Sequence, residues 1–116
     1  MNTIPPMKEK EWQAQVVELA QRLGYDFIYH TWNSRHSPAG FPDLIILKDG
    51  RMIVAELKRE GENLSAEQYF WLLEFAQVPH AEVYVWWPTD ADWEEVKSVL
   101  GGFYYRPGNK EPEEVE

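Results

Sequence analysis

Residues 43–58 read DLIILKDGRMIVAELK, and this stretch decides the fold. Two apolar runs rich in β-branched residues flank the dipeptide Asp49-Gly50, which is typical of a type I′ turn in a β-hairpin. A two-residue turn fixes the register of the two strands, so Lys48 pairs with Arg51. Continued along the hairpin, the same register predicts that Asp43 faces Glu56, with their Cβ atoms about 5 Å apart.

These two carboxylates are expected to repel each other unless a divalent cation or a shared proton lies between them. Lys58 projects to the same face as Glu56, because side chains alternate along a strand. Two carboxylates and a backbone carbonyl, such as that of Leu57, suit a hard ion such as Mg²⁺, and a nearby lysine can orient water or stabilise charge on a phosphate. The pattern indicates metal-assisted phosphodiester hydrolysis. The alternative is a surface network in which Lys58 only neutralises two acids.

The composition predicts one domain, residues 1–103, followed by an acidic tail, residues 104–116, that is expected to be disordered. The 116 residues are 44% hydrophobic and include no cysteine, and we find neither a signal peptide nor an apolar run long enough for a membrane span. A reducing compartment, and hence the cytoplasm, is the expected location. The formal net charge of −9 weighs against nucleic acid as a partner unless a local basic patch or bound cations offset it.

The remaining sequence predicts an α/β fold in which helices flank a mixed sheet. Apolar residues recur at helical spacing over residues 8–23, and Gly24 is expected to end this helix. The other predicted elements are strands at residues 25–32 and 81–87, helices at residues 65–77 and 89–100, and an extended piece at residues 103–105. Ser65 and either Thr89 or Asp90 are the expected N-caps. Because both hairpin strands are apolar on both faces, we expect both faces of the sheet to be covered.

Further candidate residues lie in the predicted helices and loops. Glu11 in the first helix is either a third metal-site carboxylate or a solvated acid favoured by the helix dipole, and Glu9 and Glu18 compete with it. Gln68 fits a capping box with Ser65, but its amide is equally suited to contact water, a phosphate or a metal ligand. The basic residues expected near the acids, and able to contact DNA phosphates, are Arg35, His36, Lys58 and Arg59.

With these segments in view, the chain resembles the PD-(D/E)xK nuclease superfamily and, more narrowly, the stand-alone virus-type replication-repair nuclease (VRR-NUC) domains common in bacteriophages. The resemblance covers about residues 8–101. The matching segments are Glu11-Trp12-Gln13, Gly40-Phe41-Pro42-Asp43-Leu44, Ala55-Glu56-Leu57-Lys58, Leu64-Ser65-Ala66-Glu67-Gln68 and Ala81-Glu82-Val83-Tyr84-Val85-Trp86. Membership would imply a restriction-endonuclease-like αβββαβ core.

The resemblance also implies roles for individual residues. Asp43 and Glu56 would be metal ligands, Lys58 the catalytic lysine, Glu11 the acid of the first helix and Gln68 the glutamine of a downstream motif. The implied activity is Mg²⁺- or Mn²⁺-dependent endonucleolytic cleavage of DNA by a homodimer, with branched DNA such as Holliday junctions as substrate, in a bacterial or phage-infected cell. A preference for flaps or linear duplexes, and a non-catalytic nucleic-acid-binding module on a nuclease scaffold, remain the alternatives.

Overall fold

A computed structural model describes residues 8–31 and 37–102 of the chain. The elements along the chain are α1 (Glu9–Arg22), β1 (Phe27–His30), β2 (Leu44–Lys48), β3 (Arg51–Leu57), α2 (Ala66–Ala76), β4 (Ala81–Trp86) and α3 (Asp90–Leu100). This order of helices and strands confirms the predicted one. The predicted extended piece at residues 103–105 and the acidic tail at residues 104–116 lie outside the described residues.

The four strands form one mixed sheet in the order β1-β2-β3-β4. The β1–β2 and β2–β3 pairs are antiparallel, and the β3–β4 pair is parallel. The hairpin register runs from Lys48 opposite Arg51 to Leu44 opposite Ala55, as predicted. Both turn residues are left-handed, with φ of 52° at Asp49 and 80° at Gly50, which confirms the type I′ turn.

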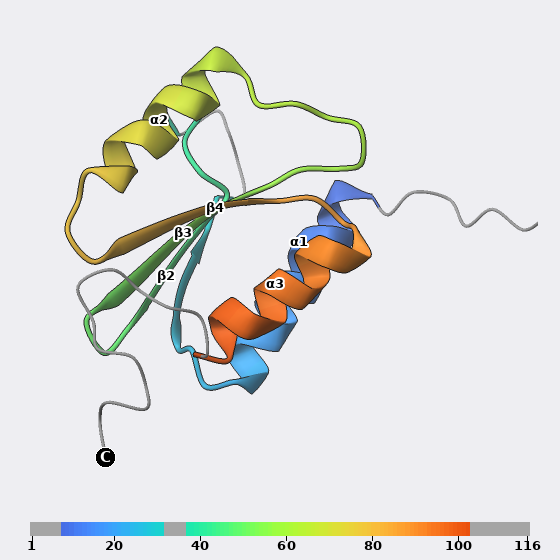
Figure 1. Ribbon diagram of the computed structural model, residues 1–116, viewed down its shortest axis with the longest axis vertical. Coiled ribbons are helices and arrows are strands. Elements are labelled where there is room, and N and C mark those ends of the chain that lie inside the picture. The colour runs from blue at the N-terminus through green and yellow to red at the C-terminus, as the bar shows by residue number, and fades with distance from the viewer. Residues whose placement is uncertain (1–7, 32–36, 103–116) are drawn as a thin grey trace, which may run out of the picture.

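The helices lie on both faces of the sheet, with α1 and α3 packed together on one face and α2 on the other (Figure 1). The main core lies between the sheet and the α1–α3 pair. Its fully buried side chains include Trp12, Val16, Leu44, Ile46, Ile53, Leu57, Trp86, Val96 and Val99. The α1 helix is also fixed to the sheet by a hydrogen bond of 3.0 Å from Trp12 Nε1 to the carbonyl oxygen of Trp86.

The second face of the sheet is only partly covered, which corrects the expectation that both faces are covered. The α2 helix packs mainly on β4, and Val54 at the centre of this face is fully buried. The outer half of the same face, formed by β1 and β2, leaves Phe27, Tyr29 and Leu47 between 46% and 70% exposed. One helix of 11 residues is too narrow to cover four strands.

A buried ion pair joins the neighbouring strands β3 and β4 near the hairpin turn. Two guanidinium nitrogens of Arg51 on β3 donate to the carboxylate of Glu82 on β4, at 2.6 and 2.8 Å. A third donates to the hydroxyl of Tyr25, at 2.9 Å, and that hydroxyl donates to the carbonyl oxygen of Leu100 at the end of α3. This inward turn of Tyr25 also explains why β1 begins at Phe27, later than predicted.

Capping residues define where α2 and α3 begin. The Ser65 hydroxyl accepts from the backbone N–H of Gln68, and Thr89 accepts in the same way from Asp92, so both predicted N-caps are confirmed. Gly24, with φ of 93°, follows the end of α1, as expected of a C-terminal glycine. Within the part of the chain that the structure describes, no helix combines the length and apolar character needed to cross a membrane.

Candidate active site

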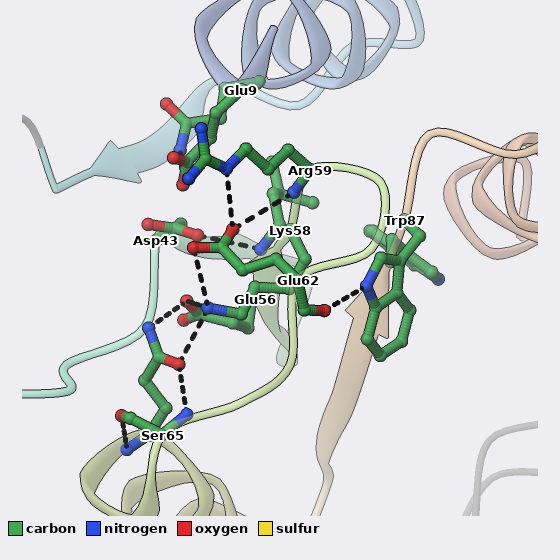
Figure 2. Close-up of polar contacts among 12 residues, drawn as sticks. Glu9, Asp43, Glu56, Lys58, Arg59, Glu62, Ser65 and Trp87 are labelled. Carbon is green, nitrogen blue, oxygen red and sulfur yellow. Dashed lines mark hydrogen bonds and ion pairs between the residues drawn. The ribbon is translucent and has the colours of Figure 1, made fainter. Parts of the chain in front are cut away.

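A cavity of about 460 Å³ opens where α1, the end of the β2–β3 hairpin and the first turn of α2 meet. Figure 2 shows the acidic and basic side chains that converge there from these elements. The predicted site residues in its wall are Asp43, Glu56, Lys58 and Gln68. The structure therefore brings together four side chains that are spread over 26 positions of the sequence.

Asp43 lies one residue beyond the end of the β2–β3 ladder, whose last pair is Leu44 with Ala55. Its carboxylate Oδ2 accepts a hydrogen bond of 2.8 Å from the backbone N–H of Leu57, and its carbonyl oxygen accepts one of 2.9 Å from Thr31. Asp43 lies beside Glu56, as predicted, with the two carboxyl groups close enough to share a hydrogen bond, and the bond from Leu57 is made in addition. Burial raises the pKa of Asp43, and the bond from Leu57 partly offsets this rise.

Glu56 is a deeply buried carboxylate, with only 2% of its surface exposed. Its Oε2 accepts a hydrogen bond of 2.9 Å from the amide of Gln68, whereas Oε1 is buried without a hydrogen-bond partner among the described residues. Burial, reinforced by the charge of Asp43, raises the pKa of Glu56 to about 8. Either a proton shared with Asp43 or a cation close to Oε1 would therefore stabilise this pair.

Lys58 supplies a buried ammonium group beside this pair. Its Nζ donates to Gln68 Oε1 at 2.9 Å and lies 4.0 Å from Glu56 Oε2. The Lys58 side chain is only 5% exposed, so it is shielded from the outer surface. It lines the cavity, and a ligand would reach it from there. Lys58 is thus placed to interact with a group inside the cavity.

Gln68 forms the predicted capping box, and its amide also contacts two of the other predicted site residues. Its Oε1 accepts from the backbone N–H of Ser65 at 2.8 Å, which completes the capping box of α2. The same oxygen accepts from Lys58, and the amide nitrogen donates to Glu56. One side chain therefore both caps the helix and orients the acid and the ammonium group.

Helix α1 presents Glu9 to the cavity, and not the predicted Glu11. The carboxylate of Glu11 accepts a hydrogen bond of 3.0 Å from the backbone N–H of Lys8, as the acid of a capping box does. Glu9 lines the cavity, where burial, reinforced by the charges of Asp43 and Glu62, raises its pKa. The sequence offered little sign of this choice, because Lys8 stands at the N-cap where a capping box normally has serine or threonine.

Sequence reasoning missed Glu62, a further acid in the cavity wall. Its carboxylate lies 3.9 Å from the Nζ of Lys58 and 3.8 Å from the Nε of Arg59. Its carbonyl oxygen accepts from Trp87 Nε1 at 2.7 Å, which attaches the loop after β3 to the end of β4 (Figure 2). The spacing of four residues between Lys58 and Glu62 was the only signal that the sequence offered.

The predicted basic patch is described only in part. Arg59 is exposed over 66% of its side chain and lies near the cavity, whereas Lys58 is buried. Arg35 and His36 lie outside the described residues.

Among the residues that the structure does describe, no group of three or more acidic or histidine side chains is arranged to hold a metal ion.

The loop that leads to Asp43 is attached to α2 by close contacts. Gly40 has φ of 83°, and a Cβ atom there would lie 2.5 Å from a backbone carbon of Glu67. The Phe41 and Trp71 rings meet edge to face, with centroids 5.2 Å apart, and Trp71 Nε1 donates to the carbonyl oxygen of Ala39 at 3.1 Å. These contacts fix Asp43 relative to Gln68.

The arrangement provides paired carboxylates with one unpartnered oxygen, a buried ammonium group and an orienting amide, all facing one cavity. Oxygen donors of this kind match the preference of Mg²⁺ and Mn²⁺, and the ammonium group can stabilise a developing negative charge.

Comparisons of the chain with models of known protein families, with curated proteins and with solved structures gave no match.

Proposed function

We propose that this protein is a divalent-metal-dependent DNA endonuclease of the VRR-NUC type, with the restriction-endonuclease-like core of the PD-(D/E)xK superfamily. The observation that supports this most strongly is the pair of the half-buried Asp43 and the buried Glu56, in which Glu56 Oε1 has no hydrogen-bond partner among the described residues and Glu56 Oε2 lies 4.0 Å from the ammonium group of Lys58. Burying two carboxylates together is costly, and a divalent cation bound by both would offset that cost.

In this proposal Asp43 and Glu56 hold Mg²⁺ or Mn²⁺, together with the backbone carbonyl of Leu57 and water, and Glu9 of helix α1 contacts the ion through a bound water. When bound, the ion supplies the positive charge that activates water and offsets the charge of the scissile phosphate. Lys58 donates a hydrogen bond to the attacking water or to a phosphate oxygen. Gln68 keeps Lys58 and Glu56 in place through the two bonds already described.

The proposed substrate is DNA, in particular branched DNA such as a Holliday junction. The cavity contains several acids, so a bound cation must reduce their charge before a phosphate can approach, which couples metal binding to DNA binding. Arg59 lies near the cavity and is a proposed phosphate contact. Arg35 and His36, which lie outside the described residues, are proposed phosphate contacts as well. This substrate would place the protein in the cytoplasm of a bacterial or phage-infected cell.

We further propose a homodimer, the usual way for a small nuclease to engage two strands. Three apolar side chains of α2, Tyr69, Phe70 and Leu73, are between 42% and 62% exposed. Exposed apolar side chains grouped on one helix are typical of interaction surfaces. Sedimentation equilibrium should give twice the chain mass of 13.7 kDa, and Phe70→Glu should shift it towards the monomer.

The proposed function is tested with a panel of four-way junction, flap, single-stranded and linear duplex DNA, in the presence of Mg²⁺, Mn²⁺ or EDTA. We expect metal-dependent cleavage that Lys58→Ala reduces by at least about 100-fold, because the charge that stabilises the transition state is lost. Lys97→Ala is the matched control, since Lys97 lies outside the cavity, in an exposed ion pair with Glu94 and over the ring of Trp93.

Each outcome separates the alternatives. Equal cleavage of all four substrates would refute structure specificity, and cleavage of only flaps or duplexes would reassign the substrate. Cleavage that survives Lys58→Ala would refute the mechanism. A protein that binds DNA but neither cleaves it nor binds Mn²⁺ in a calorimetric titration would be a non-catalytic binding module.

A further inference from the structure

A second cavity, of about 590 Å³, lies between α1 and β1. Lys10, Gln13 and His30 line both this cavity and the candidate active site, so the two cavities adjoin each other. The volume lies within the roughly 300–1,000 Å³ that is typical of sites for small organic groups. We call this second cavity the α1–β1 groove.

The walls of the groove are apolar on both sides. Ala14 and Val17 of α1 face Ile28 of β1, and Val17 and Ile28 also pack against the main core. Polar groups stand where the groove meets the active site, because His30 Nε2 lies 2.8 Å from Gln13 Oε1. Burial lowers the pKa of His30, so the imidazole at this end of the groove is neutral at pH 7.

Charge is distributed unevenly along the groove. Lys10 stands at the end next to the acids, whereas Glu18 and Gln21 stand at the other end. With a rise of about 1.5 Å per residue, Lys10 and Gln21 are about 16 Å apart along α1. A phosphate is therefore favoured beside Lys10 and disfavoured beside Glu18, so the interior of the groove suits a neutral group attached to a phosphate.

We propose that the α1–β1 groove binds an unpaired nucleobase of the DNA strand whose phosphate lies in the active site. This inference rests on the proposed nuclease function and extends it to the choice of substrate. A nucleobase has flat apolar faces, which suit the apolar surface of Val17 and Ile28, and a polar edge to which Gln13 can turn its amide by exchanging its bond to His30. A base inside a continuous duplex is stacked on both faces and cannot enter. The groove therefore selects DNA with unpaired nucleotides next to the cleavage point.

The test uses the absence of cysteine from the chain. Ala14 is an exposed residue in the wall of the groove, so Ala14→Cys places a single thiol there without disturbing the core. The probe is forked DNA with a cytosine at the first unpaired nucleotide that bears a disulfide-activated tether, mixed with the full chain in EDTA. The matched control is Ala91→Cys, because Ala91 is an exposed alanine of α3 outside both cavities.

We expect at least tenfold more cross-linking of the fork to Ala14→Cys than to Ala91→Cys, and at least tenfold more than when the tethered cytosine is paired in a linear duplex. Equal cross-linking of fork and duplex, or none, would overturn the proposal. Cross-linking to Ala14→Cys without any cleavage in the substrate panel would leave the groove assigned and refute the nuclease. Cleavage without selective cross-linking would do the reverse.

A second pair of variants tests the groove by DNA binding, independently of cross-linking. Ala14→Trp fills the groove, and we expect it to weaken binding of the fork at least tenfold while binding of the linear duplex stays within twofold; Ala91→Trp should change neither. If Ala14→Trp instead leaves fork binding intact and alters the sedimentation of the protein, the groove is a contact between protein chains and the proposal fails.

Discussion

Glu56 is the side chain whose ionisation most affects the fold. Its pKa rises from an ordinary 4.5 to about 8 because it is buried beside Asp43. Between these two values the folded protein retains a proton that the unfolded chain has released. Without metal, the free energy of unfolding should therefore fall as the pH rises from 5 to 8, by at most about 1.4 kcal/mol per pH unit from this group.

The measurement is urea denaturation at several pH values, in EDTA and in Mn²⁺. Glu56→Gln is the control, because its amide cannot release a proton, and its stability should lack this part of the pH dependence. Mn²⁺ should stabilise the wild type more at pH 8 than at pH 5, since the ion binds the deprotonated pair. Identical pH profiles for wild type and Glu56→Gln would contradict the assignment of the raised pKa.

Glu9 and Glu11 give a second test at single residues. We expect Glu9→Gln to weaken Mn²⁺ binding and to slow cleavage by about 10-fold or more, because Glu9 faces the cavity. Glu11→Gln should preserve both, and it should change the stability by less than about 1 kcal/mol, because glutamine also fits the capping box. The opposite result in isothermal titration would restore Glu11 as the acid of the first helix.

The sequence predicted the residues whose placement depends on local geometry. Asp43, Glu56 and Lys58 followed from one two-residue turn and from the alternation of side chains, and all three line the cavity. Glu9 was not chosen because it and Glu11 lie in the same helical turn. Which of the two faces the site depends on the residue at which α1 begins, and helix boundaries are hard to predict from sequence. Glu62 was missed because its position depends on the bond between its loop and Trp87, 25 residues later.

At the scale of elements, the loop before β2 and the first turn of α2 behave as one unit. Gly40→Ala should destabilise the fold by about 1–3 kcal/mol, because a Cβ atom would collide with the backbone of Glu67 in addition to the strain of a positive φ. It should also reduce cleavage, because Asp43 and Gln68 would be pushed apart.

Gly102→Ala separates these two effects. Gly102 has φ of 81°, but a Cβ atom there would meet no atom of the described residues within 4 Å. We expect a cost of about 1 kcal/mol from backbone strain alone, and normal cleavage. Chemical denaturation and the cleavage assay provide both readouts. Equal effects of the two substitutions would show that the close approach at Gly40 is unimportant.

The caps and turns were predictable because their partners are only a few residues away. Asp49-Gly50, Ser65 and Thr89 all act as their sequence context indicates. The coverage of the sheet was not predictable in this way. Apolar residues on both faces of β2 and β3 suggested two covered faces, but the position of α2 above β4 depends on contacts between distant segments.

At the scale of the molecule, the buried pair of Arg51 and Glu82 joins the hairpin to β4, and Tyr25 extends the network to the end of α3. Arg51→Leu should cost about 3–5 kcal/mol, because Glu82 stays buried without its guanidinium partner. Replacing both Arg51 and Glu82 by leucine should recover much of this loss. Urea denaturation measures both variants.

The exposed pair of Lys97 and Glu94 is the control for that prediction. Lys97→Leu should change the free energy of unfolding by less than about 1 kcal/mol, because an exposed ion pair contributes little. A similarly small effect of Arg51→Leu would mean that the buried network does not stabilise the fold. The sequence did not reveal this network, since an arginine beside a hairpin turn is usually exposed.

Gln68 has one further consequence, which concerns motion. Its side chain closes the first turn of α2 and at the same time bonds Lys58 and Glu56, so the assembled site exists only while that turn is closed. Helix ends open and close more readily than the centres of sheets. If the proposed function holds, the fraction of time in which the site is assembled is set by fraying at one helix end, and a bound cation or substrate should slow hydrogen exchange at the Gln68 backbone amide.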